Sequence, residues 1–185
     1  MTLIVLEGLS ASGKSTIRDE LLRRNPEWIK WKGENLMRKG PGDNWKEYQR
    51  RYHEALHRLY ELNPENIIVA DRAFSDFAYN SDPQFRQEMG RLYACYGNVH
   101  ILYFTPCPWD DDTFFEADDK IREILQQRGS RDLPNAGHIR GRYKKLLQMF
   151  DHTMIDTGVE KLQSIKQAEN AIMDVHNDTE HNPDI

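Results

Sequence analysis

Cysteine is scarce in this sequence, which has only Cys95 and Cys107 among its 185 residues. Two thiols cannot supply the disulfide framework on which small secreted domains depend, and this fits a reducing compartment. Long apolar runs are lacking too, because the run at residues 3–6 ends at Glu7, far short of the ~20 residues that span a membrane. No basic segment precedes that run. The sequence therefore predicts a cytoplasmic protein without a signal peptide or a membrane span.

Positive charge is in deficit as well. The chain carries 25 Lys and Arg against 30 Asp and Glu, so its formal net charge is −5 at pH 7. This balance excludes a histone-like or strongly basic coat protein, although a local basic groove for nucleic acid remains compatible with it. The length suits one domain that buries roughly two thirds of the surface of the unfolded chain. We expect a single domain over residues 1–176, followed by a disordered polar tail at 177–185.

Segments with strand and helix patterns alternate along the chain. β-rich apolar runs predict strands at residues 2–7, 28–32, 66–71, 99–104 and 153–156. Helical periodicity predicts helices from the segment after residue 13 to Pro26 and at 45–62, 84–97, 113–127, 136–151 and 160–175. The run 66–71 is apolar up to a final acid, which is typical of a strand buried on both faces of a parallel sheet. The pattern predicts an α/β fold with a five-stranded parallel sheet covered by helices on both faces.

The strongest motif lies between the first strand and the first helix. Residues 8–15 match G-x-x-x-x-G-K-[ST], and the strand before and the helix after supply the context that this motif requires. Glycines let backbone N–H groups turn toward phosphate oxygens, and the helix N-terminus adds its positive dipole end. Lys14 would bring a mobile charge to the β- and γ-phosphates. We therefore predict an ATP site formed by Gly8, Ser10, Ala11, Ser12, Gly13, Lys14, Ser15 and Thr16.

Acidic residues beside this loop predict a magnesium site. Asp71 ends the buried strand 66–71, and an acid at the carboxyl edge of a neighbouring strand lies close to the metal, directly or through water. We expect Ser15, Asp71 and Glu7 to hold Mg²⁺. The adjacent Arg72 is expected to point at a substrate phosphate, so Lys14, Asp71 and Arg72 are predicted as catalytic residues.

Several segments together resemble the thymidylate kinase family. Members of that family carry an E-G-x-D-x-x-G-K-S-T loop and a D-R-x-x-x-S-x-x-A-[YF] strand end, which residues 7–16 and 71–79 resemble. Residues 139–146 and 154–156 are similar to the helix after the lid and to the final strand of the family. The resemblance implies a P-loop kinase that transfers the γ-phosphoryl group of ATP, with Mg²⁺, to a pyrimidine deoxynucleoside monophosphate such as dTMP or a modified analogue. It also implies a possible homodimer.

The sequence departs from the family at the loop and at the strand end. Ser10 stands where the family has its loop Asp, Ala11 leaves the loop without the Arg that some members carry, and Ser75 comes one residue early. These departures are compatible with a phage or viral member that has an altered substrate range.

Without a loop Arg, another cation must meet the charge that develops on the transferred phosphoryl group. Residues 127–131 form a polar, glycine-containing break between two predicted helices, the composition of a segment that closes over bound nucleotide. We therefore expect a helical lid at about 110–136. Among its candidates Arg122, Arg128 and Arg131, we predict Arg128 and Arg131 as the catalytic cations.

The acceptor side is expected on the helix 45–62 and after Asp71. In the resembling family an aromatic ring from this region stacks on the base, and an Arg meets its edge or the acceptor phosphate. Tyr48, Arg51, Phe74 and Arg72 are therefore predicted to bind the nucleotide substrate. Glu34 is a further candidate, since it would accept the proton of a 5′-hydroxyl if the acceptor were a nucleoside.

Two other patterns leave alternatives open. Residues 53–57 read H-E-x-x-H, a zinc-site pattern, but no third ligand follows at the usual spacing. Residues 140–145 carry four basic side chains on a predicted helix, a face that would suit DNA or RNA. The alternatives are therefore a kinase for a hydroxyl of a nucleoside or of DNA or RNA, for example a hydroxymethyl-pyrimidine or a 5′-OH, and a non-catalytic ATP-binding module, which Ser10 keeps open.

Overall fold

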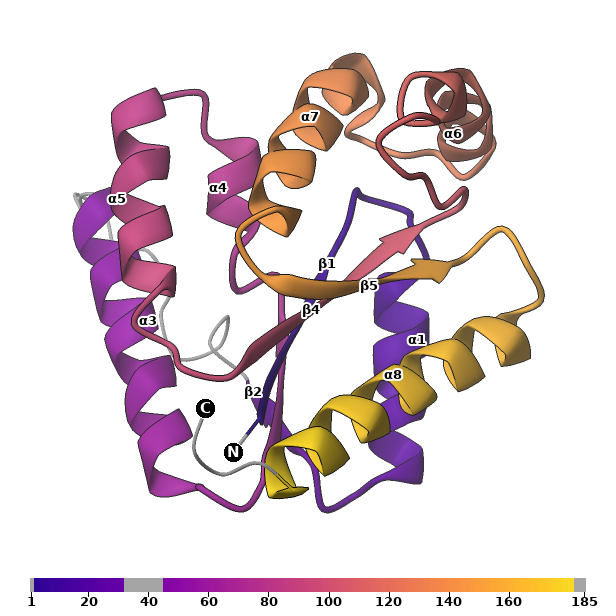
Figure 1. Ribbon diagram of the computed structural model, residues 1–185. Helices are drawn as coiled ribbons and strands as arrows, with labels where there is room; N and C mark the ends of the chain where they lie inside the picture. Colours follow the sequence, from indigo (N-terminus) through magenta and orange to yellow (C-terminus); the bar gives the residue numbers. More distant parts are fainter. Residues whose placement is uncertain (1, 32–44, 182–185) are drawn as a thin grey trace.

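The computed structural model describes residues 2–31 and 45–181, and within these ranges five parallel strands form one sheet (Figure 1). The strands are β1 (Thr2–Glu7), β2 (Ile29–Trp31), β3 (Ile67–Asp71), β4 (Val99–Thr105) and β5 (Asp151–Asp156). Their order is β2-β3-β1-β4-β5. The strand that leads into the phosphate loop is therefore central, and the predicted five-stranded parallel α/β sheet is confirmed.

Helices cover both faces of this sheet (Figure 1). One face is covered by α1 (Lys14–Arg24) and α8 (Lys161–His181). The other face is covered by α3 (Trp45–Leu62), α4 (Ser75–Tyr79), α5 (Pro83–Tyr93) and α7 (Ala136–Leu147). A further helix, α6 (Glu116–Gln127), follows the carboxyl end of β4 and leads through a short 3-10 turn, Leu133–Asn135, into α7.

The sheet separates two hydrophobic cores. Leu3 and Val5 point into the core under α3, α5 and α7, whereas Ile4 and Leu6 point into the core under α1 and α8. Successive side chains of a strand face opposite sides, so a strand with a core on each face must be apolar at every position. Residues 3–6 of β1 follow this pattern, and the polar residues at its two ends, Thr2 and Glu7, are buried as well. No helix in the two described ranges has both the length and the apolar character that crossing a membrane requires.

The structure differs from the expected elements at several boundaries. The short helix α4 was not predicted, and α5 ends at Tyr93 rather than at residue 97. β5 begins at Asp151, a residue that the pattern gave to the helix before it, and α7 ends earlier, at Leu147. α8 continues to His181, which makes residues 177–181 helical where a disordered tail was expected. The sequence contains no helix-breaking residue between the predicted end of that helix and Pro183, so nothing stops it earlier.

The entrance of the phosphate loop is packed against β4. Gly8 has a φ of 141°, in the region that favours glycine, and a Cβ added there would lie 2.5 Å from the carbonyl oxygen of Phe104. Only a residue without a side chain lets the loop leave β1 at this angle.

Gly8→Ala is expected to lower the free energy of unfolding by roughly 2 kcal/mol or more, because the new methyl group meets backbone that cannot move aside. A urea titration measures this. Gly141→Ala is the matched control, since a Cβ at that position in α7 meets nothing within 4 Å. Alanine is the better helix former, so this control should unfold at the same urea concentration as the wild type or a higher one. Equal destabilisation of both variants would contradict the explanation.

Candidate active site

A cavity of about 530 Å³ lies where the phosphate loop leaves the sheet. Residues 9–16 of the loop line it, together with Arg18, Asp71, Arg72 and Arg131. The parallel register explains why β1 and β3 meet here: Leu6 of β1 pairs with Asp71 of β3, so the carboxyl ends of these two strands lie side by side. The structure thus brings the predicted loop residues, Asp71, Arg72 and one lid arginine around a single cavity. Gly8 lies behind this lining, against β4.

The backbone of the loop is shaped to receive an anion. Ala11 and Gly13 have positive φ angles of 63° and 88°, and they turn the chain so that α1 begins at Lys14. The first turn of α1 contains no acidic side chain. Its free N–H groups and the positive end of the helix dipole are therefore available to phosphate oxygens.

Lys14 and Arg18 both pair with Asp71. Lys14 is only 5% exposed, and its Nζ lies 3.1 Å from Oδ1 of Asp71, while the guanidinium of Arg18 bonds Oδ2. Burial lowers the pKa of Lys14, and the charge of Asp71 opposes this effect. The carboxylate of Asp71 thus holds the lysine at the loop.

Arg72 is fixed in an unusual backbone conformation. Its φ is 57°, a left-handed value that costs free energy for any residue other than glycine. Its N–H donates to the carbonyl of Leu6 at 2.9 Å, and its Nη1 donates to the hydroxyl of Tyr79 at 3.2 Å. These bonds hold the guanidinium at the wall of the cavity.

Glu7 lies in the interior and does not line the cavity. Its Oε1 accepts a hydrogen bond from the N–H of Phe74 at 2.8 Å, and its Oε2 accepts one from the hydroxyl of Tyr143 at 2.9 Å. Burial raises the pKa of this carboxyl to about 7. The position argues against the predicted metal role, because both oxygens already bond to protein groups. Glu7 instead ties the end of β1 to the start of α4 and to α7.

Ser15 and Asp71, the other two predicted metal ligands, line the same cavity. A hydroxyl and a carboxylate are oxygen donors of the kind that Mg²⁺ prefers, and Mg²⁺ usually takes only one or two carboxylates in addition to phosphates and waters. The described residues contain no cluster of three or more acidic, His or Cys side chains able to hold a metal. The donor set therefore fits Mg²⁺ that is held largely by phosphates.

The segment predicted as a lid lies against the phosphate loop. The Oγ of Ser130 donates to the carbonyl of Ser10 at 2.7 Å. Arg128 spans from the loop to the turn after β5: Nη2 donates to the carbonyl of Thr157 at 2.7 Å and Nη1 to that of Ala11 at 3.5 Å. Of the lid arginines, Arg131 lines the cavity, whereas Arg122 pairs with Asp118 of its own helix.

The predicted acceptor residues are less well placed. Phe74 is fully buried and stacks on Tyr93, with ring centroids 4.0 Å apart, so it is a core residue and not an exposed surface for a base. Its role was misjudged because the chain turns inward directly after Arg72. Tyr48 is half-buried and Arg51 is exposed on α3, and neither lines the cavity at the loop. Glu34 lies outside the described residues.

Some polar residues of the site region escaped the sequence analysis. Asp76 of α4 is largely buried and accepts a hydrogen bond from the side chain of Gln49 on α3, and burial raises its pKa to about 7. Its place inside the D-R-x-x-x-S-like segment was the available signal. Asp132, Ser130 and Tyr79 were missed because their partners are remote in sequence.

Each of the two competing patterns contains one residue that is buried in the interior of the fold. His53 is 1% exposed among aromatic rings, its Nδ1 lies 3.1 Å from the hydroxyl of Tyr96, and burial lowers its pKa to about 3. On the basic helix α7, Arg140 is fully buried and pairs with Asp118, and Lys144 pairs with Asp111 at 2.9 Å. Much of the predicted basic face is therefore engaged within the protein.

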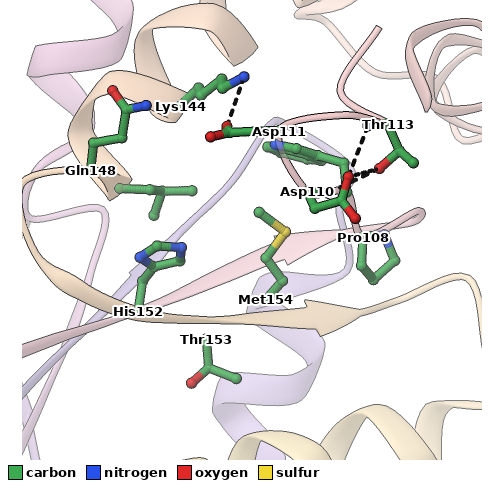
Figure 2. A pocket seen from close by; sticks show the side chains of 11 residues that line it. Pro108, Asp110, Asp111, Thr113, Lys144, Gln148, His152, Thr153 and Met154 are labelled. Atoms are coloured by element: carbon green, nitrogen blue, oxygen red, sulfur yellow. Dashed lines mark hydrogen bonds and ion pairs between the residues drawn. The ribbon is translucent and has the colours of Figure 1, made fainter. Parts of the chain in front are cut away.

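A second cavity, of about 750 Å³, lies beside the edge strand β5 (Figure 2). The loop after β4 and the end of α7 form its walls, and Figure 2 shows Lys144 and Asp111 paired across it. His152 and Met154 of β5 contribute to its floor. None of the predicted site residues lines this cavity.

Comparison with known proteins shows which solved structures share this fold. No family model matches the sequence, and no curated protein matches it either. Among solved structures, the YorR protein of Bacillus subtilis is 17% identical with a TM-score of 0.57, covering 97% of this chain and 98% of that one. The deoxyadenosine kinase of M. mycoides is 14% identical with a TM-score of 0.53, covering 93% and 99%. The gluconokinase of Sinorhizobium meliloti 1021 is 10% identical with a TM-score of 0.53, covering 98% and 97%. The chain therefore has the fold of P-loop kinases over nearly its whole length.

The buried carboxyl of Glu7 predicts a pH dependence of stability. Its pKa rises from the ordinary value of 4.5 to about 7 on folding, so the folded protein binds a proton that the unfolded chain has released in this window. The free energy of unfolding should therefore fall as the pH rises from 4.5 to 7, by up to ~3 kcal/mol from this group. Urea titrations across this range measure the slope.

Glu7→Gln should remove its share of that slope, while the share of Asp76 remains in both proteins. The control is Glu27→Gln, at an exposed glutamate, which should keep the slope of the wild type. A Glu7→Gln variant with the unchanged slope would show that folding does not raise the pKa of Glu7.

Proposed function

We propose that the protein is an ATP- and Mg²⁺-dependent phosphotransferase that transfers the γ-phosphoryl group to a pyrimidine deoxynucleoside monophosphate, such as dTMP or a modified analogue. One observation carries the proposal. Four cationic side chains line the cavity at the phosphate loop, and a single carboxylate, that of Asp71, opposes them. This excess of positive charge, in a protein of net charge −5, suits two phosphorylated ligands rather than one.

Each part of the site has a role in this proposal. The loop N–H groups and Lys14 bind the phosphates of the donor, and Lys14 exchanges its bond to Asp71 for one to phosphate. Arg72 binds the phosphate of the acceptor, and Arg131 meets the charge that develops on the group in transfer. Mg²⁺ bound near Ser15 and Asp71 would neutralise phosphate charge. Catalysis is then positional and electrostatic, since phosphoryl transfer needs little covalent chemistry from the protein.

The choice of a nucleotide acceptor has two further supports. The motifs around residues 7–16 and 71–79 resemble those of thymidylate kinases. In addition, the deoxyadenosine kinase structure holds dCMP and dCDP, and the YorR structure is described with phosphorylated GDP. Gluconokinase has the same fold and acts on a sugar acid by its name, so the experiment must include other acceptors.

The experiment is product detection by mass spectrometry after incubation with Mg-ATP and a pool of nucleosides, nucleoside monophosphates, gluconate and oligonucleotides with free 5′-hydroxyls. We expect a pyrimidine deoxynucleoside diphosphate from the wild type.

Lys14→Ala should lower the rate of phosphoryl transfer at least about a hundredfold, because the loop loses its mobile charge. The variant should still fold and show a cooperative unfolding transition.

The other products would separate the alternatives. A nucleoside monophosphate or a phosphorylated oligonucleotide would keep the phosphotransferase and replace the acceptor. ATP binding without any product would favour the non-catalytic module. Full turnover by Lys14→Ala would contradict the phosphate-loop mechanism itself.

The two lid arginines should differ in effect. Arg131→Ala is expected to lower kcat by roughly a hundredfold, because Arg131 faces the cavity where charge develops. Arg128→Ala should lower kcat by no more than about tenfold, since its guanidinium bonds the carbonyls of Ala11 and Thr157. Steady-state kinetics with saturating substrates measure both, with the exposed Arg91→Ala on α5 as the control for loss of a positive charge. The reverse ranking would assign the catalytic role to Arg128.

A further inference from the structure

Asp132 has a position and a set of bonds that neither the loop motif nor the proposed roles explain. It precedes the 3-10 turn Leu133–Asn135, where an Asp would ordinarily cap the turn, yet its side chain makes no cap bond. The residue is only 7% exposed. Its Oδ2 accepts two hydrogen bonds instead, from the N–H of Ser10 at 2.5 Å and from the hydroxyl of Tyr79 at 2.5 Å.

These bonds join the two halves of the site. Ser10 belongs to the phosphate loop, where the donor is proposed to bind, and Tyr79 ends α4 on the acceptor side. The hydroxyl of Tyr79 also accepts from Nη1 of Arg72 at 3.2 Å, and the guanidinium lies over the Tyr79 ring, 5.4 Å from its centroid. One carboxylate oxygen therefore connects the phosphate loop with the arginine at the acceptor side.

The connection requires the lid segment to be closed. Ser130, two residues before Asp132, donates to the carbonyl of Ser10 at 2.7 Å and accepts from the N–H of Asp132 at 3.3 Å. If this segment moved away, Ser10 and Tyr79 would both lose their carboxylate, and Arg72 would keep a hydroxyl that nothing orients. Hydrogen bonds to a carboxylate in a buried site are strong ones, so the difference between the two states is substantial.

We propose that Asp132 is a positioning residue that couples closure of segment 128–135 over the phosphate loop to the placement of Arg72 on the acceptor. The inference rests on the proposed phosphotransferase function and adds to it a relay from Ser10 through Asp132 and Tyr79 to Arg72. Asp132 does not contact the reacting groups in this proposal. It orients Arg72 for the acceptor only when segment 128–135 covers the phosphate loop.

Kinetics of three variants test the relay. Tyr79→Phe removes the link to Arg72 but leaves the bond between Asp132 and Ser10, so it should raise the KM for the acceptor about tenfold and leave the KM for ATP within about twofold. Asp132→Ala removes both bonds and should raise both KM values about tenfold or more. Asp132→Asn retains an acceptor oxygen and should recover part of the loss.

The double variant Tyr79→Phe/Asp132→Ala distinguishes a relay from two structural defects. Its acceptor KM should equal that of Asp132→Ala alone, because the same link cannot be broken twice. Tyr60→Phe, at a buried tyrosine whose hydroxyl accepts from the N–H of Asn98, and Asp119→Ala, at an exposed acid of α6, are the controls and should behave as the wild type. If the double variant instead multiplied the acceptor KM increases of the two single variants, the proposal would be overturned. Faster turnover or tighter ATP binding by Asp132→Asn would also overturn it, because either result would mean that the carboxylate obstructs the loop.

Tryptic cleavage keeps this test separate from that of the proposed function. Arg128 lies in the closed segment, four residues before the substituted position, so Asp132→Ala should be cut after Arg128 at least about tenfold faster than the wild type and than Asp119→Ala. If the wild type phosphorylates no acceptor, the proposed function fails. Faster cleavage of Asp132→Ala would still support the role of Asp132 in holding segment 128–135 over the phosphate loop. Equal cleavage rates of Asp132→Ala and the wild type would overturn it. If Asp132→Ala does not fold, Tyr79→Phe and Asp132→Asn still decide the kinetic test.

Discussion

The position of β1 between β3 and β4 is the constraint on which the candidate site depends. The parallel register sets Leu6 beside Asp71 and Glu7 beside Tyr103, so three strands end at one edge of the sheet. The loop leaves that edge against the backbone of β4, which is why position 8 must be glycine. α1 then returns over the sheet with Lys14 at its first turn, where it meets Asp71. A polar site is assembled in this way at the end of a buried strand whose residues 3–6 are all apolar.

The charge at the cavity is opposite in sign to the net charge of the protein. The chain is acidic, yet the cavity at the loop is lined by four cations and one carboxylate, and the backbone adds the positive end of α1. Near this cavity, Asp71 is paired with Lys14 and Arg18, and Glu7 is buried with a raised pKa. The four cationic side chains, which outnumber the one carboxylate of the lining, thus produce a local field for phosphate. Net charge is therefore a poor guide to the ligand of this site.

The acceptor side shows where pattern reasoning reached its limit. Phe74 and Glu7 stand in the motif-like segments, and both are fully buried. The side chain of Glu7, at the end of β1, bonds the N–H of Phe74 and the hydroxyl of Tyr143 in the interior, and the chain after Arg72 turns inward. The sequence places Arg140 on a basic helix face, although its guanidinium lies over the rings of Trp109 and Phe114 and pairs with Asp118. Residue type and helical spacing do not reveal which side of an element the rest of the protein covers. A charged side chain inside a well-paired site looks the same in sequence as one in water.

The sequence by itself determined the α/β class, the five strands, the central apolar strand and the phosphate loop with its helix. These features depend on neighbours in the chain: alternation, periodicity, glycine positions and the strand–loop–helix order. Only the tertiary structure decided which lid arginine faces the cavity, that Glu7 is interior, and that Asp132 bonds the backbone of Ser10. Asp132 and Ser10 are 122 residues apart. Contacts of this kind arise from how α6, α7 and the sheet pack together, and packing is a property of the whole chain rather than of any segment of it.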